Sequence, residues 1–528
     1  MSSQRFFRLF ACLIFSACVA HAELRLPAQF GEGAVLQRET AWKLRGWATP
    51  GAIIEIRLDG QHTRTTASGE GRWQASMDPL DGGGPYVLHL QTDHGDDLEH
   101  PVWAGEVWVA SGQSNMQWTI DRSRNADLHR AIWDYPEIRI LRVAPEGSAD
   151  KTLEFDDAWR PATRGNLGDM SAIGFHFAQI LHEYLGVPVG IIDVSWGGSA
   201  IEAWMDRDLL ATDPRFRLID ELWREFEQRY DFAAEMERHE GRIAAWERRR
   251  DAALRRGEDP PRQPRAPRNL MKGNQRPGNI FNNRVQPLLG TAIGGVIWYQ
   301  GESNARDPEL YAELFPAMIG DWRDRWGQGN FPFYWVQLTA FRNRQPSGPD
   351  ASWAFLREAQ SRTRALPRTG EAVTIDIGDG ADIHPWEKEE VARRLARWAL
   401  AHEYEARGIA YAAPRIAGWE PDGEHVRIHF ANTDGGLLTR EFDVVHGFAV
   451  AGEDRAWHTV EGHLINGREV RLEVPPDVRI KAVRYAWADN PLVNLYSTEG
   501  LPVTPWRSDT WERTGERQMV PRFLTDEP

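Results

Sequence analysis

The middle of this chain alternates apolar segments with amphipathic helical segments, and this alternation constrains its fold more than any other feature. Ile173, Phe177 and Leu181 recur at helical spacing, and an apolar segment at 187–196 follows them. Strands and helices in alternation predict an α/β domain whose parallel sheet is covered on both faces, with ligands at the carboxyl ends of its strands. Further strands are expected at 294–300, 331–339 and 372–377, and further helices at 308–326, 351–366 and around Val391, Leu395 and Trp398.

The segments on either side of this region have the pattern of β-structure. Apolar and polar residues alternate at 54–58 and again at 426–430, and a period of two indicates half-buried strands. A chain of 528 residues is long enough for several cores. We therefore predict a β-sandwich domain over 23–103, the α/β domain over 104–405 and a second sandwich-like domain over 406–528.

One segment interrupts the alternation. Residues 215–257 have the pattern of long, highly charged helices, and a segment rich in proline and arginine follows at 260–267. We interpret 215–275 as a helical excursion from the α/β domain. The favoured interpretation is a solvated helix with a basic linker, and the alternative is a rim of the active site or an oligomer contact. The sequence leaves the oligomeric state open.

Composition restricts the partners of the protein. With 41% apolar and 26% charged residues the chain is typical of globular proteins. Its formal net charge of −15 argues against nucleic acid and anionic membranes as partners. Of the 24 tryptophans, a few are expected to contact sugar rings and most to pack in the core. No segment approaches the 18 apolar residues that a transmembrane helix needs.

Residues 1–22 have the pattern of a secretory signal peptide. A basic start precedes a short apolar segment, and a small-x-small cleavage site ends at Ala22. Both cysteines of the chain, Cys12 and Cys18, lie within this segment, so the mature chain would contain no disulfide. The expected location is therefore secreted or periplasmic. The alternative is a lipoprotein signal, which would leave an acylated Cys18.

The best candidate for a catalytic residue follows the apolar segment 107–110. The next residues include Gly-Gln-Ser-Asn-Met at 112–116, with the serine at Ser114. A serine at the end of a buried strand, followed by a turn, occupies the position of the nucleophile in α/β hydrolases. Serine is a weak nucleophile, so it requires a base, an orienting acid and oxyanion donors from elsewhere in the chain.

Two further strand ends offer donors to an oxyanion. The apolar segment 187–196 runs into a Gly-Gly turn that includes Gly198, and glycine allows a backbone N–H to approach a ligand closely. The segment 298–304 delivers Gln300, Glu302 and Asn304 to the end of an aromatic strand. The amide of Asn304 suits a developing oxyanion, although Asn304 would also serve as a loop cap and Glu302 as a surface residue.

A third strand end carries a histidine among acidic residues. Asp376, Asp379 and Asp382 precede His384, which we expect to follow a strand and to open a helix. A histidine with an acid nearby suits a general base and its orienting group. A lone histidine before a helix is more often a cap or a surface residue, so this segment alone is weak evidence.

The order of these motifs is more specific than any one of them. Gly-Gln-Ser-Asn-Met, Gly-Gly-Ser, Trp-Tyr-Gln-Gly-Glu-Ser-Asn and Asp-Ile-His-Pro, in this order, resemble the SGNH (GDSL-like) hydrolase superfamily and, more narrowly, the sialate O-acetylesterase-like family of carbohydrate esterases. Segments near both ends of the mature chain, at 30–38, 484–491 and 494–502, are also similar to that family. The resemblance implies a flavodoxin-like parallel sheet flanked by helices.

The resemblance also implies roles for individual residues. It makes Ser114 the nucleophile and His384 the base, with the backbone N–H groups of Ser114 and Gly198 and the amide of Asn304 as the oxyanion hole. The superfamily's usual acid lies three residues before the histidine, where this chain has Ala381. Asp382, two residues before, is therefore our preferred acid. The alternatives are a supporting or acidic role for Gln300, Glu302, Asp379 or Asp376, and a dyad in which a backbone carbonyl orients His384.

The implied reaction is the hydrolysis of O-acetyl esters on a carbohydrate, without a metal or another cofactor. The family name implies acetylated sialic acid, and the alternative substrates are plant polysaccharides such as xylan or xyloglucan. A sialate carboxylate favours a nearby Arg or Lys, and the motif segments place none beside Ser114. This favours neutral sugars unless another loop supplies an arginine. The rival functions are a carbohydrate-binding protein with a decayed esterase site and a secreted lipase or thioesterase.

Overall fold

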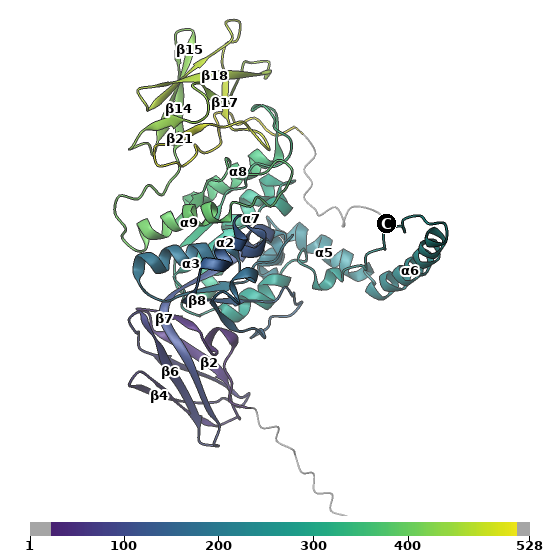
Figure 1. Cartoon of the computed structure of the whole chain (residues 1–528), viewed down its shortest axis with the longest axis vertical. Coiled ribbons are helices and arrows are strands. Elements are labelled where there is room, and N and C mark those ends of the chain that lie inside the picture. The colour runs from purple at the N-terminus through teal and green to yellow at the C-terminus, as the bar shows by residue number, and fades with distance from the viewer. Residues whose placement is uncertain (1–22, 515–528) are drawn as a thin grey trace, which may run out of the picture.

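A computed structural model describes residues 23–514 of the chain, and the predicted signal segment lies outside the described residues. Two β-rich regions lie at opposite ends of a central α/β domain (Figure 1). In the N-terminal region β2 pairs with β5, while β3, β4, β6 and β1 join a sheet that includes β7. The strands of this region are β1 (Val35–Gln37), β2 (Trp42–Trp47), β3 (Ile53–Leu58), β4 (Gln61–Thr66), β5 (Arg72–Met77), β6 (Gly83–Thr92) and β7 (Asp97–Gly112).

Strand β7 belongs to both the N-terminal sheet and the central sheet. Its first part pairs antiparallel with β6, and its second part pairs in parallel with β10 (Val189–Asp193) and β11 (Gly295–Tyr299). Exposed residues occur along the first part, whereas every residue from Ala104 to Gly112 is buried, as in strands covered on both faces. The expected boundary between residues 103 and 104 therefore lies within one continuous strand.

The central sheet has the strand order β13-β12-β11-β7-β10-β8-β9. All neighbouring strands in it are parallel except β8 and β9, which are antiparallel. The sheet is therefore mixed, whereas the sequence predicted a purely parallel sheet. After β7 the chain forms the strands on one side of it, ending with β10, and then crosses to the other side to form β11. Ligands bind at the carboxyl ends of the strands where the strand order reverses in this way. The remaining strands are β8 (Tyr135–Arg142), β9 (Trp159–Ala162), β12 (Phe333–Val336) and β13 (Thr369–Ala372).

Helices cover both faces of this sheet. Phe333 and Tyr334 are neighbours on β12 and therefore point to opposite faces. Phe333 contacts Phe315 of α7, whereas Tyr334 contacts Trp398 of α9. Helix α3 packs against α9, and α8 packs against α7. These helices are α3 (Ala172–Leu185), α7 (Pro308–Trp326), α8 (Ser352–Arg362) and α9 (Lys388–His402).

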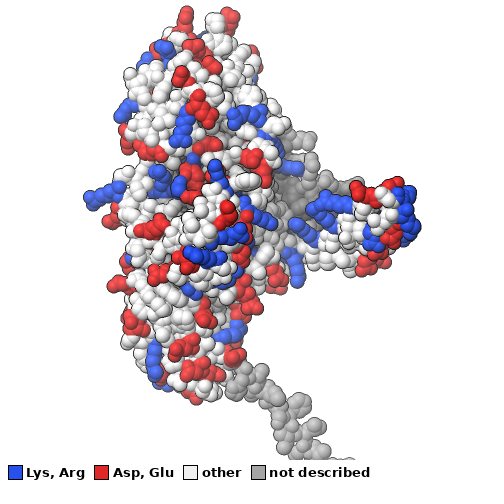
Figure 2. All heavy atoms as spheres, viewed as in Figure 1, with Lys and Arg blue, Asp and Glu red and all other residues white. Residues whose placement is uncertain are grey.

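The segment predicted as a helical excursion contains α5 (Arg217–Arg229) and α6 (Phe232–Arg255), preceded by α4 (Arg207–Thr212). Helix α5 is held by Arg207, whose Nε lies 2.7 Å from the Asp220 carboxylate. Helix α6 projects away from the domain, and charged side chains of both signs gather over it (Figures 1 and 2). Within residues 23–514, no helix has the length and apolar character needed to cross a bilayer.

The C-terminal region is an antiparallel, nearly closed β-sandwich or barrel. Its main sheet has the order β14-β15-β19-β18-β17-β20-β22, and β16 pairs with β21. Apolar side chains such as Ile428, Val450 and Leu472 are buried inside it. The strands are β14 (Arg415–Asp422), β15 (His425–Ala431), β16 (Leu437–Thr439), β17 (Val445–Ala451), β18 (Trp457–Ile465), β19 (Glu469–Glu473), β20 (Ala482–Tyr485), β21 (Leu495–Ser497) and β22 (Trp506–Arg507).

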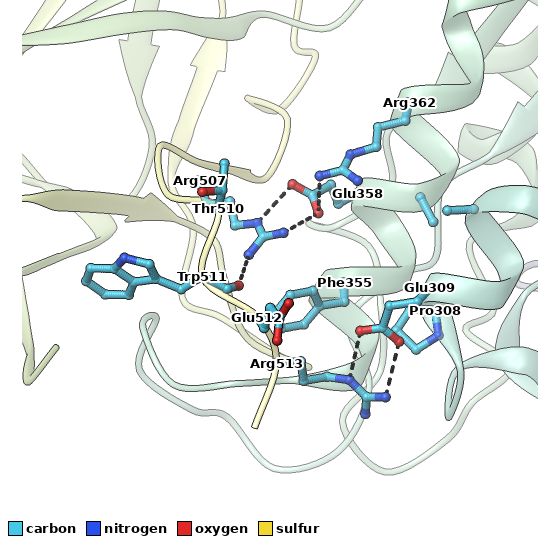
Figure 3. Close-up of a pocket in the computed structure, with 12 residues that line it drawn as sticks. Pro308, Glu309, Phe355, Glu358, Arg362, Arg507, Thr510, Trp511, Glu512 and Arg513 are labelled. Atoms are coloured by element: carbon cyan, nitrogen blue, oxygen red, sulfur yellow. Dashed lines mark hydrogen bonds and ion pairs between the residues drawn. The ribbon is translucent and has the colours of Figure 1, made fainter. Parts of the chain in front are cut away.

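The last described segment returns to the α/β domain and contacts helices α7 and α8 (Figure 3). The Arg507 guanidinium binds both carboxylate oxygens of Glu358 at 2.9 Å, and Arg513 binds both oxygens of Glu309 at 3.2 Å. A cavity of about 350 Å³ lies between this segment and the two helices. Neither Ser114 nor any of its predicted partners lines this cavity. These ion pairs therefore attach the C-terminal region without contributing to the predicted site.

One predicted strand is displaced. The sequence places a strand at 372–377, but β13 ends at Ala372, and residues 373–377 leave the sheet. Val373 and Ile375 are nevertheless buried, in a small cluster with Ala340. Their apolar character reflects burial under the C-terminal region, and periodicity alone does not distinguish a buried loop from a strand.

Candidate active site

Ser114 is the first residue of the short helix α1 (Ser114–Gln117), two residues after the end of β7. Gly112 has φ of +124°, and a Cβ at this position would lie 2.2 Å from the carbonyl oxygen of Tyr299. Only glycine therefore allows β7 to turn this closely against β11. The Gln113 N–H donates to the same carbonyl at 2.8 Å, which fixes the turn that presents the half-buried serine.

The structure brings His384 into contact with Ser114. Its Nε2 lies 2.9 Å from the serine Oγ, within hydrogen-bond distance. The imidazole stacks on the indole of Trp118, with ring centroids 4.5 Å apart and planes 12° apart. Burial lowers the pKa of His384, and the nearby Asp382 carboxylate opposes that shift. The expectation that His384 opens a helix is wrong, because α9 begins at Lys388.

Asp382 is the acid that contacts His384. Its Oδ1 lies 3.2 Å from the ring Nδ1 and also accepts a hydrogen bond from the backbone N–H of His384 at 2.9 Å. With Nε2 directed at the serine and Nδ1 at a carboxylate, the imidazole has the two contacts that a general base in a triad requires.

The alternative acids have other partners. Asp376 forms a two-oxygen ion pair with Arg394, at 2.6 and 2.9 Å. Asp379 accepts the N–H of Ala381 at 2.8 Å, and Glu302 accepts from the amide of Asn115 at 2.6 Å. None of these three predicted alternatives therefore contacts the histidine ring.

The Gly-Gly turn lies directly against Ser114. The Trp196 N–H donates to the Gly112 carbonyl at 2.9 Å, which ties the end of β10 to the end of β7. A Cβ on Gly197 would lie 3.2 Å from the Ser114 Cβ, and Gly198, which is exposed, follows with φ of +73°. This turn therefore places the backbone of Gly197 beside the serine, and the N–H of the next residue, Gly198, remains the predicted oxyanion donor.

Asn304 is held in one orientation by three contacts. Its Oδ1 accepts the N–H of Ile201 at 3.0 Å and an amide hydrogen of Gln300 at 2.7 Å. Its Nδ2 must then carry the donors, and one of them binds Glu202 at 3.0 Å. Glu202 is buried, and burial raises the pKa of its carboxyl group. Since an amide nitrogen carries two hydrogens, one remains for a ligand.

Sequence reasoning missed the polar groups beneath Ser114. Lys388 is fully buried, and its Nζ lies 2.5 Å from Oδ1 of Asn115. The amide nitrogen of Asn115 donates to Glu302 and, at 3.0 Å, to the Ile383 carbonyl. Burial lowers the pKa of Lys388 to about 7. Asn115 lies within the serine motif, so its place in the motif was the available signal; Lys388 gave none before its burial was known.

A cation also lies beside the site. Arg122 is exposed, and its guanidinium carbon lies 5.2 Å from the centroid of the Trp118 ring that stacks on His384. Its positive charge contributes to lowering the pKa of His384. Among the acidic side chains in residues 23–514, none pairs with this guanidinium, whereas the neighbouring Arg124 pairs with Glu387. Arg122 lies outside the motif segments, so it supplies the arginine that the expectation of a neutral sugar had left open.

The described residues contain no group of three or more His, Cys, Asp or Glu side chains that could hold a metal ion. The chemistry that this arrangement can perform is nucleophilic attack by an activated serine on an electrophile bound above the Gly-Gly turn.

Comparisons with known proteins identify the family of this chain. Residues 271–399 match a family model described as a carbohydrate esterase, sialic acid-specific acetylesterase. The sialate O-acetylesterase of Mus musculus is 31% identical over 416 residues, which cover 72% of this chain and 73% of the relative. The sialate O-acetylesterase of Homo sapiens is 29% identical over 427 residues, which cover 74% of this chain and 73% of the relative. A solved carbohydrate acetylesterase from Xanthomonas citri is 34% identical with a TM-score of 0.77, covering 92% of this chain and 100% of that chain. This chain therefore belongs to the sialate O-acetylesterase family of carbohydrate esterases.

Proposed function

We propose that the protein is a serine hydrolase that removes O-acetyl groups from carbohydrates. The observation that carries this proposal is the contact between Ser114 Oγ and His384 Nε2, at 2.9 Å, with Asp382 on the other side of the imidazole. A serine hydroxyl gains nucleophilicity from a base within hydrogen-bond distance, and the base gains its orientation from a third group.

In the proposed reaction His384 accepts the hydroxyl proton while Ser114 Oγ attacks the acetyl carbonyl carbon. The tetrahedral intermediate collapses by breaking the bond to the sugar oxygen, which takes the proton back from His384 and leaves as an alcohol. Water, deprotonated by His384, then attacks the acetyl-serine and releases acetate. Asp382 stabilises the imidazolium that forms in both halves of the reaction.

The proposed oxyanion hole contains three donors on three different segments. They are the N–H of Ser114 on α1, the N–H of Gly198 after β10, and the amide of Asn304 after β11. The close approach of the Gly-Gly turn to Ser114 and the fixed orientation of Asn304 support this assignment. Donors fixed in advance stabilise the charge as it develops, without the cost of reorganising solvent.

We assign the central domain to the SGNH class with a flavodoxin-like sheet. Strands β10, β7, β11, β12 and β13 are adjacent in this order, and along the chain they come second, first, third, fourth and fifth once β8 and β9 are counted as insertions. The order 2-1-3-4-5 is that of flavodoxin-like sheets. The position of Ser114 after the first of these strands supports the same assignment.

For the substrate, we propose an O-acetylated sialic acid. The mouse and human relatives are named sialate O-acetylesterases, and Arg122 supplies an exposed guanidinium without an acidic partner among the described residues. A guanidinium is the preferred partner of a carboxylate, which sialic acid has and neutral hemicellulose sugars lack.

Two rival functions are less consistent with the site. A carbohydrate-binding protein with a decayed esterase site has no need of a serine, a histidine and an acid in hydrogen-bonded order. A lipase or thioesterase requires an apolar groove for its acyl chain, whereas the exposed Arg122 and the half-buried Asp382 lie near the Ser114–His384 pair. Comparing the hydrolysis of aryl acetate with that of aryl octanoate would distinguish a lipase from an acetylesterase.

The test of the proposed function measures acetate released from an O-acetylated sialoside and from acetylated xylo-oligosaccharides, by the unaltered protein and by Ser114→Ala. We expect release from the sialoside and none from Ser114→Ala. Release by the variant at the full rate would remove Ser114 from the mechanism. Release only from the xylo-oligosaccharides would retain the esterase and replace the proposed substrate with a neutral sugar.

We also propose that the protein is exported, on the pattern of residues 1–22, which lie outside the described residues. Sequencing the N-terminus of the protein from its native host, with a start at Glu23 expected, tests this. A start at an acylated Cys18 would indicate a lipoprotein instead.

A further inference from the structure

A buried polar chain lies beneath the proposed nucleophile, and the mechanism above gives it no role. Lys388 donates to the side-chain oxygen of Asn115, and the side-chain nitrogen of Asn115 donates to Glu302. The nitrogen also donates to the carbonyl of Ile383. Both polar atoms of the Asn115 amide are therefore bound, the oxygen by a donor and the nitrogen by two acceptors.

The two ends of this chain are an amine and a carboxyl group, and both are buried. Lys388 has no exposed surface, and its ammonium lies 5.7 and 5.8 Å from the ring centroids of Trp118 and Tyr299. The Glu302 carboxylate is the largest favourable electrostatic influence on it. A buried charge that loses its partner is strongly destabilised, so each end depends on the other through Asn115.

The members of the chain come from the three segments that form the proposed site. Asn115 adjoins Ser114, Glu302 lies two residues before Asn304, and Lys388 lies four residues after His384. The bond from Asn115 to Ile383 also reaches the residue directly before His384. These segments are far apart in the sequence, and the Asn115 side chain contacts two of them from the third.

We propose that Lys388, Asn115 and Glu302 act as a positioning unit that holds the Ser114 turn, the Asn304 loop and the His384 loop in one arrangement. Lys388 and Glu302 are thus positioning residues for the reaction and do not touch the substrate. This inference rests on the proposed function. The sequence offered Glu302 as an alternative acid for His384, but in this unit Glu302 acts on Lys388, through Asn115.

The charge of Lys388 also acts on His384. The groups that act on the histidine are Asp382 on its own loop, Lys388 on α9 and Arg122 after α1. Those that face Lys388 are Glu302, Asp382 and the rings of Trp118 and Tyr299. A cation near an imidazole favours its neutral form, which is the form that accepts the serine proton. Removing the cation therefore raises the pKa of His384.

The experiment compares Lys388→Met, which keeps the shape and removes the charge, with Glu302→Gln and with the double variant. Lys481→Met is the matched control, because Lys481 pairs with Glu453 at the surface of the C-terminal region and loses the same charge. kcat/KM for an aryl acetate is measured from pH 4 to 9. Titration of reactive serine with a fluorophosphonate normalises each rate to the folded protein, so that a loss of stability does not imitate a loss of rate.

Lys388→Met is expected to lower kcat/KM about 10- to 100-fold, because displacements of 1 Å at a reacting centre have costs of this size. The acid limb of its pH profile is expected at higher pH than that of the unaltered protein. The double variant should lose less than the product of the two single losses, since it removes both buried charges together. Lys481→Met should retain the unaltered rate and profile.

The inference is overturned if Lys388→Met keeps the unaltered rate per titrated serine. It is also overturned if the loss of kcat/KM in the double variant equals the product of the two single losses. Where Lys388→Met yields no folded protein, the profile of the isosteric Glu302→Gln decides: a rate and pH profile identical to those of the unaltered protein overturn the inference. Ser114→Ala measured in parallel separates the two levels, because activity in that variant would contradict the proposed function instead.

Discussion

One carboxylate oxygen of Asp382 contacts His384 twice, at the ring Nδ1 and at the backbone N–H. The ring contact is the longer of the two, at 3.2 Å, and the Asp382 side chain is 46% exposed. A residue two positions before the histidine reaches the ring only by folding back over its own backbone. The imidazole is therefore oriented by a solvated acid as well as by its stacking on Trp118.

Asp382→Asn is predicted to impair the enzyme less than the loss of a buried triad acid does. Removing a buried acid typically costs about 10⁴-fold in kcat. Solvent competes for the exposed Asp382 carboxylate, and Trp118 still holds the ring, so we expect a loss of about 10- to 100-fold. Steady-state kinetics on an aryl acetate measures the loss. Asp379→Asn, which removes a nearby carboxylate without contact to the ring, is the control and should change little.

The pH dependence of the reaction follows from the lowered pKa of His384. The histidine must be neutral to accept the serine proton, so kcat/KM falls as the pH drops through its pKa. Burial lowers this pKa below the ordinary 6.5, which places the acid limb of the profile below pH 6.5. Asp382 raises the pKa, so Asp382→Asn should move the limb to still lower pH, opposite to the shift expected for Lys388→Met. A limb above pH 6.5 in the unaltered protein would contradict this assignment.

Asn304→Ala is predicted to lower kcat about 10²- to 10³-fold, the usual effect of losing one oxyanion donor. The effect should fall on kcat and leave KM nearly unchanged, since the amide acts mainly on the transition state. Glu202→Gln is the informative companion. Its amide oxygen still accepts the Asn304 hydrogen, so it should retain most of the activity, whereas Glu202→Ala should resemble Asn304→Ala. If Glu202→Gln and Glu202→Ala lose kcat equally, Glu202 does not act by orienting the Asn304 amide.

Gly112→Ala is predicted to destabilise the fold. Alanine at φ of +124° is strained, and its Cβ would lie 2.2 Å from the backbone oxygen of Tyr299, which belongs to a buried strand and cannot move aside. We expect a loss of about 1–3 kcal/mol or more in the free energy of unfolding. Thermal unfolding measures it, and Gly69→Ala, where a Cβ has nothing within 4 Å, is the control. Equal melting temperatures for the two variants would contradict the argument.

The sequence carried most of the local information about Ser114 and Asn304, because each of these residues follows a strand of the central sheet. A buried strand that ends in a polar turn can be recognised from residue types alone, whereas His384 lies twelve residues after the end of β13 and was predicted from the order of the motifs. The sandwich pattern near each end was recognised for the same reason, since a period of two needs only a short segment.

What the sequence did not reveal depends on distances between segments. The alternatives for the acid stayed open because the partners of Asp376 and Glu302 lie far along the chain, at Arg394 and Asn115. The continuation of β7 from one sheet into the next was hidden, since a change from alternating to continuous burial has no single marker. Arg122 lies only eight residues after Ser114, but nothing in its own segment indicates that Trp118 brings it beside the histidine.

Arg122 gives the last prediction, which concerns the choice of substrate. Arg122→Ala should leave kcat/KM for an aryl acetate within about 2-fold of the unaltered value, because the guanidinium does not touch the serine or the ring of His384. It should raise KM for an O-acetylated sialoside about 10- to 100-fold, the usual effect of losing a hydrogen bond to a charged group.

The sialoside methyl ester, which lacks the charge, should show no difference between Arg122→Ala and the unaltered protein. Arg64→Ala is the matched control, because Arg64 is exposed on β4 of the N-terminal region and its loss changes the net charge equally. Salt at 1 M should reduce the advantage of the unaltered protein on the free acid, since it shortens the screening length to about 3 Å. If Arg122→Ala slows the free acid and the methyl ester alike, the guanidinium supports the loop of Trp118 and does not recognise a carboxylate.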